Sequence, residues 1–209
     1  MPSLYIITGS NGAGKSSIGP QYLPEYIKKN YNVFDGDLLF VIKQRELFPE
    51  ITRSPKEARK LAFQYVTDTF ELLTANALEA NEPFVYEGHF TNDATWDAPR
   101  RFKAAGYDIH LIFLGLKTPD LSQLRVTNRV SEDGHFVDRQ TLDDNFKGNL
   151  EMLNHNYKLI DHLTIVDTSE IQHITLAILN SGTVMSAVQA DMLPDWFTFY
   201  MPSIAALIP

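Results

Sequence analysis

Short apolar runs bounded by turn residues alternate along the chain with stretches whose apolar residues recur every three or four positions. The first pattern predicts buried strands, and the second predicts amphipathic helices. Their alternation is typical of βα units on a mostly parallel sheet with helices on both faces, which is an α/β fold. We predict about five strands, over residues 4–8, 32–35, 83–86, 109–116 and 163–166.

Three helices can be located from capping residues and apolar spacing. Ser54 can cap the first, Pro55 suits its first turn, and Glu57 can reach back to the cap. Large apolar residues then recur at helical spacing, which predicts that this helix packs on the sheet: Leu61, Tyr65, Val66, Phe70, Leu73 and Leu78. A second helix begins at residues 118–120 by the same capping logic. A third is indicated by the spacing of Leu142, Phe146, Leu150 and Leu153.

Residues 9–16 read GSNGAGKS and match the phosphate-loop pattern G-x-x-x-x-G-K-[ST] in full. The alternative is a glycine-rich turn that binds nothing, but the motif follows an apolar strand and precedes a helix start, as a phosphate loop does. Glycines let backbone amides turn toward a triphosphate, Lys15 would bridge its β- and γ-phosphates, and Ser16 would be a Mg²⁺ ligand. The predicted nucleotide-binding residues are Gly9, Ser10, Asn11, Gly12, Ala13, Gly14, Lys15, Ser16 and Ser17.

The motif makes the predicted architecture a three-layer P-loop NTPase fold with a helical lid. Pro20 stands where the helix after the loop should still be running. Because proline removes a ladder hydrogen bond and crowds the preceding turn, we expect that helix to be short or kinked.

Acidic residues follow the second predicted strand. Asp35 and Asp37 come at its carboxyl end, the edge of the sheet where doubly wound folds bind ligands. Two residues apart in an extended chain, they would point to one side. Asp37 can act as the base for an acceptor hydroxyl, and Asp35 as a Mg²⁺ ligand in the substrate site. The alternative is a polar Asp-Gly-Asp turn that caps a helix.

The third predicted strand ends in Glu87, Gly88 and His89 at the same edge of the sheet. A single acid suits the binding of substrate hydroxyls or of a metal-bound water, and the glycine leaves room for a ligand. Glu87 can otherwise be a surface residue at a strand end. His89 is a further substrate-site candidate, although a lone histidine is more often a structural group.

Three arginines flank a polar segment in the second half of the chain. Arg125 and Arg129 stand four residues apart on one face of a predicted helix, and Arg139 follows a polar loop over residues 131–136. Arginines near a γ-phosphate stabilise the charge of phosphoryl transfer. We therefore predict a lid over residues 118–156. The alternative is a helix face of solvated charges.

Composition narrows the classes of function. With 209 residues and 44% hydrophobic content, we expect one domain over residues 1–209. The formal charge of −8 argues against general binding to nucleic acid or to an anionic membrane. The absence of cysteine excludes disulfides, thiolate catalysis and cysteine-ligated zinc. With no basic leader and no apolar run of the ~20 residues that a membrane helix needs, we expect a cytoplasmic protein.

Five segments occur in a fairly specific order over residues 1–170: GSNGAGKS (9–16), FDGD (34–37), YEG (86–88), LSQLRVTNRV (121–130) and GHFV (134–137). Together they resemble the zeta-toxin-like P-loop kinases of bacteria. The resemblance implies ATP- or GTP-dependent phosphorylation of a sugar hydroxyl, in the best-known members that of UDP-N-acetylglucosamine, and toxicity restrained by an antitoxin protein. It also implies that Asp37 is the base, Glu87 a substrate-site residue and Arg129 a catalytic γ-phosphate contact.

The chain departs from the family pattern in its lid. Typical members carry a second lid arginine near the position of Gly134 and His135, so the chain is more similar to a branch with a Gly-Gly-His signature, of which these two residues remain. That branch also has an arginine before the aromatic residue of the next helix, where this chain has Asn145 before Phe146. His135 can replace an arginine as a phosphate donor, although histidine is charged only part of the time near neutral pH.

Several functions remain open on the sequence. The leading hypothesis is a Mg²⁺-dependent kinase that phosphorylates a hydroxyl group of a small molecule. Its nearest rival among enzymes is a kinase of metabolic or antibiotic hydroxyl groups, because Asp-x-Asp after the second strand also resembles the motif of shikimate-type kinases. A nucleotide-gated switch is less favoured because the chain has no [NT]-K-x-D motif and no two-acid metal strand. A third is a degenerate homologue that binds an antitoxin through the aromatic tail, residues 193–209, although such a tail more often packs on its own domain.

Overall fold

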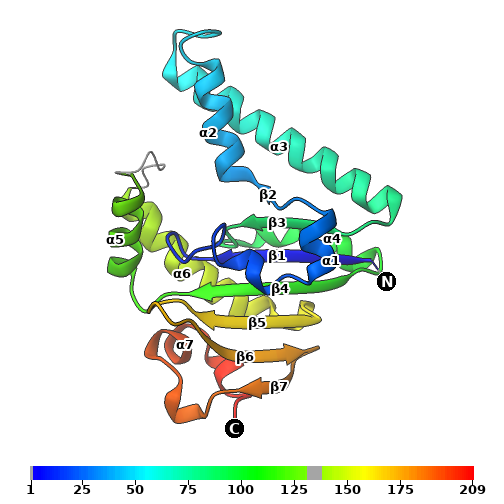
Figure 1. The fold of residues 1–209 in the computed structure, drawn as a ribbon, viewed down its shortest axis with the longest axis vertical. Coiled ribbons are helices and arrows are strands. Elements are labelled where there is room, and N and C mark those ends of the chain that lie inside the picture. The colour runs from blue at the N-terminus through cyan, green and yellow to red at the C-terminus, as the bar shows by residue number, and fades with distance from the viewer. Residues whose placement is uncertain (1, 131–137) are drawn as a thin grey trace.

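Five parallel strands form most of the sheet, starting from the edge strand β2, in the order β2-β3-β1-β4-β5 (Figure 1). The computed structural model describes residues 2–130 and 138–209, without the side chains of residues 129 and 130. The strands are β1 (Ser3–Gly9), β2 (Phe34–Asp35), β3 (Phe84–Gly88), β4 (Asp108–Gly115) and β5 (His162–Asp167). Each contains or overlaps an apolar run that the sequence marked, so the predicted mostly parallel α/β fold is confirmed.

Two further strands extend the sheet beyond β5, which makes seven in place of the predicted five. They are β6 (Ile174–Asn180) and β7 (Thr183–Ala187), and both run antiparallel to their neighbours. Ser181 and Gly182 join them with positive φ angles of 46° and 77°, as a tight hairpin turn requires. The pair escaped prediction because β7 is mostly exposed and its sequence lacks a clear apolar alternation.

Helices cover both faces of the sheet. On one face, Tyr26 of α1 (Glu25–Asn30) shares a hydrogen bond of 2.9 Å with Tyr5 of β1. On the other, Asn149 of α6 (Arg139–Asn156) accepts a hydrogen bond of 3.2 Å from Thr8 of β1. Helices α4 (Asp97–Ala104) and α7 (Asp195–Tyr200) join α6 there, through ring contacts with residues of β3 and β4. The α6 stripe of Leu142, Phe146, Leu150 and Leu153 is buried as predicted.

The segment after the phosphate loop forms no α-helix. A hydrogen-bonded turn at Gly14 leads into the short 3-10 helix η1 (Gly19–Tyr22), with Pro20 in its first turn. The expected short or kinked helix directly after the loop is therefore absent, and a turn and a four-residue 3-10 helix take its place, with Pro20 where α-helical bonding would have to continue.

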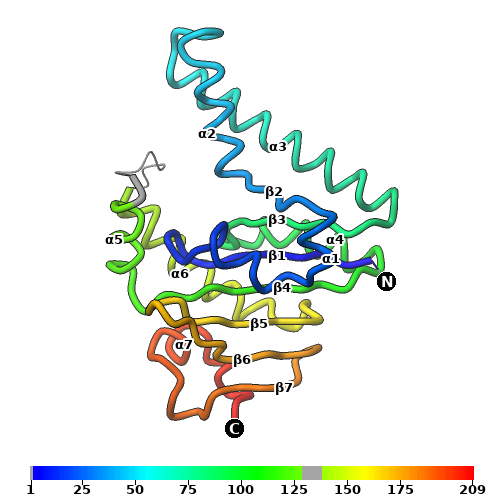
Figure 2. The backbone as a smooth tube through the Cα atoms, in the orientation of Figure 1, coloured from blue at the N-terminus to red at the C-terminus, as the bar shows by residue number. Residues whose placement is uncertain are grey.

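Helices α2 (Gly36–Leu47) and α3 (Pro55–Ala80) form a hairpin that projects beyond the edge strand β2 (Figure 2). Ser54 caps α3 by accepting from the Glu57 amide at 3.2 Å, as predicted, whereas the Glu57 carboxylate accepts from Thr52. The prediction that the whole of α3 packs on the sheet is wrong. Its sheet contacts come from its second half through Phe70, while three predicted packing residues are at least 38% exposed: Leu61, Tyr65 and Leu73.

The C-terminal segment packs on its own sheet. It contains η4 (Ala190–Met192), α7 and α8 (Pro202–Ala205). Five of its apolar side chains are buried in the core: Trp196, Phe197, Met201, Ile204 and Ile208. The other elements are η2 (Asp93–Trp96), α5 (Pro119–Val130) and η3 (Tyr157–Leu159). None of the described helices combines the length and apolar character of a membrane span.

Candidate active site

The phosphate loop owes its path to glycines at two crowded positions. Gly9 has φ of +142°, and a Cβ there would lie 2.1 Å from the carbonyl oxygen of Leu114. Gly14 has φ of +91°, and a Cβ there would lie 2.4 Å from the Ile18 side chain. Only glycine meets both demands, because other residues disfavour positive φ and have no room here.

Three side chains, two from α5 and one from the segment after β5, hold the carbonyl groups of the loop. Ser122 of α5 donates to the Asn11 carbonyl at 2.6 Å, and Thr168 after β5 donates to the Ala13 carbonyl at 3.0 Å. Arg125 donates to the Gly12 carbonyl at 3.4 Å. With its carbonyls bound on the outside, the loop is free to direct amides toward an anion.

Lys15 lies at the centre of the loop and is 8% exposed. Its Nζ is 3.4 Å from the Gly9 carbonyl oxygen and 3.5 Å from that of Ser10. It is also 3.3 Å from Nε2 of His89 at the end of β3. The predicted phosphate lysine and the predicted substrate-site histidine are therefore neighbours.

Oxygen atoms from three segments converge beside the lysine. The Ser16 hydroxyl donates to Glu87 Oε1 at 2.9 Å and lies 3.5 Å from Asp35 Oδ2. Asp35 Oδ1 accepts from the Leu38 amide at 2.9 Å, so Asp35 also caps α2. The interpretation of Asp35 as a helix cap is therefore confirmed, and its contact with Ser16 leaves the role of Mg²⁺ ligand a prediction.

These oxygens fit Mg²⁺, which prefers hard oxygen ligands and is usually held by one or two carboxylates together with phosphate oxygens. Ser16, Asp35 and Glu87 would hold it, directly or through water. The described residues contain no cluster of three acidic or histidine ligands, so such an ion would depend on the phosphates of a nucleotide.

Glu87 is 8% exposed, and its ionisation reflects this crowding. Burial and, after it, the nearby Asp35 carboxylate raise the pKa of its carboxyl group to about 7, while Lys15 opposes the shift. A cation between the two carboxylates would relieve their repulsion.

Asp37 lies in the first turn of α2, not in extended chain as the sequence suggested. The two aspartates consequently differ in surroundings, since Asp35 meets Ser16 while Asp37 Oδ2 lies 3.9 Å from His89 Nε2. The Asp37 side chain is 75% exposed, which leaves it open to an incoming ligand.

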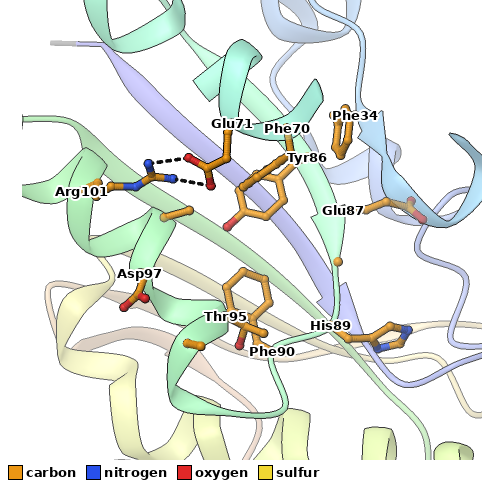
Figure 3. Close-up of a pocket in the computed structure, with 13 residues that line it drawn as sticks. Phe34, Phe70, Glu71, Tyr86, Glu87, His89, Phe90, Thr95, Asp97 and Arg101 are labelled. Atoms are coloured by element: carbon orange, nitrogen blue, oxygen red, sulfur yellow. Dashed lines mark hydrogen bonds and ion pairs between the residues drawn. The ribbon is translucent and has the colours of Figure 1, made fainter. Parts of the chain in front are cut away.

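A cavity of about 520 Å³ opens beside Glu87 and His89 (Figure 3). Its walls are aromatic, formed by Phe34, Phe70, Tyr86 and Phe90. Glu71 and Arg101 form an ion pair at 2.8 Å on the side of the cavity away from Glu87 and His89. The buried Tyr86 hydroxyl has no hydrogen-bond partner among the described residues. The cavity thus offers apolar walls with a few polar groups, as small-molecule sites do.

The predicted lid is described in part. Arg125 donates to the carbonyls of Gly12 and Ser169, so it braces the loop from outside. Arg139 pairs with Asp120 at 2.7 Å and with Asp143 at 3.0 Å. Two predicted site residues lie outside the described part of the chain: the side chain of Arg129 and the whole of His135.

Asn149 was missed by the sequence analysis. It is fully buried on α6 and bonds to Thr8, Phe90 and the His89 ring. One turn earlier, Asn145 donates to Asn11 of the phosphate loop at 2.8 Å. A polar residue on the otherwise apolar stripe of α6 was the available signal.

Comparison with solved structures supports this fold. The structure of the AvrRxo1-ORF1:ORF2 complex matches with a TM-score of 0.71 and 15% identity, covering 96% of this chain and 64% of that chain. The same complex with ATP matches with a TM-score of 0.66 and 13% identity, covering 100% of this chain and 77% of that chain. The PezAT toxin-antitoxin system of Streptococcus pneumoniae matches with a TM-score of 0.58 and 19% identity, covering 83% and 72%.

The chain therefore spans 64% of the length of the first of these relatives. No curated protein sequence matches it. The family model described as Zeta toxin matches residues 1–177, which include the phosphate loop, both aspartates, Glu87 and His89. The chain belongs to the zeta toxin family of P-loop proteins.

Proposed function

We propose that the protein is a kinase that transfers the γ-phosphoryl group of ATP or GTP to a hydroxyl group of a small molecule. One observation carries the proposal: Lys15, the Ser16–Glu87–Asp35 oxygens and the His89–Asp37 pair adjoin one another at a single edge of the sheet. Membership of the zeta toxin family supports it. We further propose that the protein acts in the cytoplasm and that residues 1–209 form a single domain that carries the whole active site.

Each group has a place in the transfer. The loop amides and Lys15 bind the β- and γ-phosphates, and residues 9–17 surround them. Ser16 and Asp35, with Glu87 beside them, would hold Mg²⁺ directly or through water, and the ion would neutralise phosphate charge. Arg129 and His135 of the lid would contact the γ-phosphate, with Arg125 holding the loop behind it.

Asp37 acts as the base. It takes the proton of the acceptor hydroxyl as the acceptor oxygen bonds to the γ-phosphorus and the bond from that phosphorus to the β–γ bridging oxygen breaks. The nucleoside diphosphate leaves, and the acceptor keeps the phosphoryl group. Glu87 and His89, at the mouth of the cavity, orient the acceptor.

The acceptor we favour is a nucleotide sugar such as UDP-N-acetylglucosamine. A groove of about 470 Å³ begins at Asp37 and runs between α2 and α3, where Phe40 and Phe63 line it. Three cations line the same groove, and none forms an ion pair with another described residue: Lys56, Arg59 and Lys60. Unpaired cations beside aromatic rings suit an acceptor that carries both phosphate and a ring.

An antitoxin protein is the proposed partner. The PezAT neighbour is a toxin-antitoxin system, and AvrRxo1-ORF1 was solved in complex with ORF2. Induced expression of the chain should arrest bacterial growth, and Lys15→Ala should remove that effect. Equal arrest by the variant would separate toxicity from phosphoryl transfer.

Transfer of labelled γ-phosphate from ATP or GTP to a panel of nucleotide sugars tests the proposal. Lys15→Ala should abolish transfer, and Asp37→Asn should reduce kcat by ~10²-fold or more while nucleotide affinity changes little. The exposed Asp191→Asn is the matched control and should keep full activity. A fully active Asp37→Asn variant would move the role of base to Asp35 or Glu87, and near-normal turnover by Lys15→Ala would contradict the kinase proposal.

A further inference from the structure

The side-chain amide of Asn149 is fixed at both ends. Its Oδ1 accepts from the Phe90 backbone amide at 2.6 Å and from the Thr8 hydroxyl at 3.2 Å. Its Nδ2 donates to the Asn145 carbonyl at 2.5 Å. A backbone N–H can only donate and a carbonyl can only accept, so the amide cannot be rotated by 180° without losing both bonds.

This orientation decides which nitrogen of His89 carries the proton. The second hydrogen of Asn149 Nδ2 points to Nδ1 of His89 at 3.1 Å, so Nδ1 must present its lone pair. A neutral imidazole ring then carries its proton on Nε2. A doubly protonated ring would set an N–H group against the amide N–H in a site where the histidine side chain is only 16% exposed.

The protonated nitrogen faces the reacting groups of the proposed kinase. Nε2 lies 3.3 Å from Lys15 Nζ and 3.9 Å from Asp37 Oδ2. Two donors cannot bond to each other, and the lysine has the carbonyl oxygens of Gly9 and Ser10 within 3.5 Å as acceptors. The Nε2–H therefore faces the space between the phosphate lysine and the proposed base, where the Gly9 carbonyl is also within its reach.

We propose that Asn149 is a positioning residue that holds His89 as a neutral Nε2–H donor to the oxygens of the transferred phosphoryl group and its acceptor. The inference rests on the proposed function. A fixed neutral donor stabilises developing charge without placing a second cation beside Lys15. It also cannot transfer a proton to Asp37 and so disable the base.

The remaining contacts agree with this role. Asn145, whose carbonyl anchors Asn149, also donates to Asn11 of the phosphate loop. One turn of α6 thus fixes the loop and the histidine relative to each other.

Nitrogen NMR of the ¹⁵N-labelled, nucleotide-free protein tests the proposal without needing transfer. His89→Gln identifies the His89 signals among the six histidines. We expect a lone-pair-type shift for Nδ1 and an N–H-type shift for Nε2 between pH 6 and pH 8. In Asn149→Asp, the carboxylate would accept from the ring, so Nδ1 should become N–H type.

The same variant tests the consequence for catalysis. Asn149→Asp should lower kcat for transfer to UDP-N-acetylglucosamine by about 10-fold to 100-fold, with KM for ATP little changed. Asn154→Asp, on the same helix and likewise an acceptor for backbone amides, is the matched control and should change neither tautomer nor rate.

Two results would overturn the proposal. One is a lone-pair-type Nε2 in the wild-type protein, a result that stands even if Asn149→Asp does not fold. The other is an Asn149→Asp variant with a switched tautomer and an unchanged kcat. If the tautomers behave as expected but no acceptor is phosphorylated, the proposed function fails while the positioning of His89 stands.

Discussion

Glu87 carries a carboxyl group whose ionisation opposes folding. Burial and the neighbouring Asp35 raise its pKa to about 7, above the value of an exposed glutamate. A raised pKa means that the folded protein binds the proton more tightly than the unfolded chain, so this contribution to stability is lost as pH rises through about 7.

Glu87→Gln should therefore raise the melting temperature of the nucleotide-free protein at pH 8. The gain should shrink toward pH 5, where the wild-type carboxyl is protonated in the folded state. Thermal unfolding at both pH values measures the effect, with the exposed Glu79→Gln as control. An equal shift at both pH values would contradict the assignment of a buried, repelled carboxylate.

At the same scale, the sequence revealed the site residues that are local. The phosphate loop is readable because eight consecutive residues specify its backbone and its charge. For Asn149 the sequence offers only a polar position on an apolar helix stripe and does not identify its partners, because Thr8 and Phe90 lie 141 and 59 residues away along the chain. Asp35 is an intermediate case. Its cap on α2 is a local contact that the sequence indicates, whereas its contact with Ser16 joins two separate segments of the chain.

A stack of rings crosses three strands of the sheet. Tyr5, His110 and His162 are in register on β1, β4 and β5, with ring centroids 4.5 Å and 4.3 Å apart. Burial, followed by the proximity of His162, lowers the pKa of His110 to about 4. The unfolded chain therefore takes up a proton at higher pH than the folded protein does, and stability falls as pH drops from about 6.5 to about 4.

His110→Phe keeps a ring in the stack and removes this titration. The melting temperature of the variant should fall less than that of the wild-type protein between pH 6.5 and pH 4. The exposed His155→Phe serves as control, and parallel curves for His110→Phe and the wild type would show that His110 is not the group responsible.

The helices and strands differ in how well the sequence predicts their position and packing. Strands buried on both faces and capped helices were located, because continuous apolar runs and caps are strong local signals. The packing of α3 was not, since apolar spacing does not name the partner of a helix. The buried positions of its first half are Ala58 and Ala62, small residues that let α2 approach, whereas the larger Leu61 and Tyr65 are exposed.

On the scale of the whole molecule, the C-terminal segment completes the core. The family match ends at residue 177, yet α7 beyond it buries Trp196 and Phe197, and α8 buries Ile204. A Cβ at Gly115 of β4 would lie 2.2 Å from the Trp196 ring, so strand and ring fit each other closely. This packing favours a structural role for the aromatic tail over a free interface.

Trp196 and Phe199 allow a matched test of that role, since they lie three positions apart in α7 but differ in burial. Trp196 is 3% exposed and packs near Phe113, whereas Phe199 is 75% exposed. Trp196→Ala should lower the free energy of unfolding by about 3–5 kcal/mol, because a large buried ring leaves a cavity. Phe199→Ala should cost less than about 1 kcal/mol. Urea unfolding measures the free energy of unfolding of both variants. Similar losses for the two variants would contradict the structural role of the buried Trp196 ring.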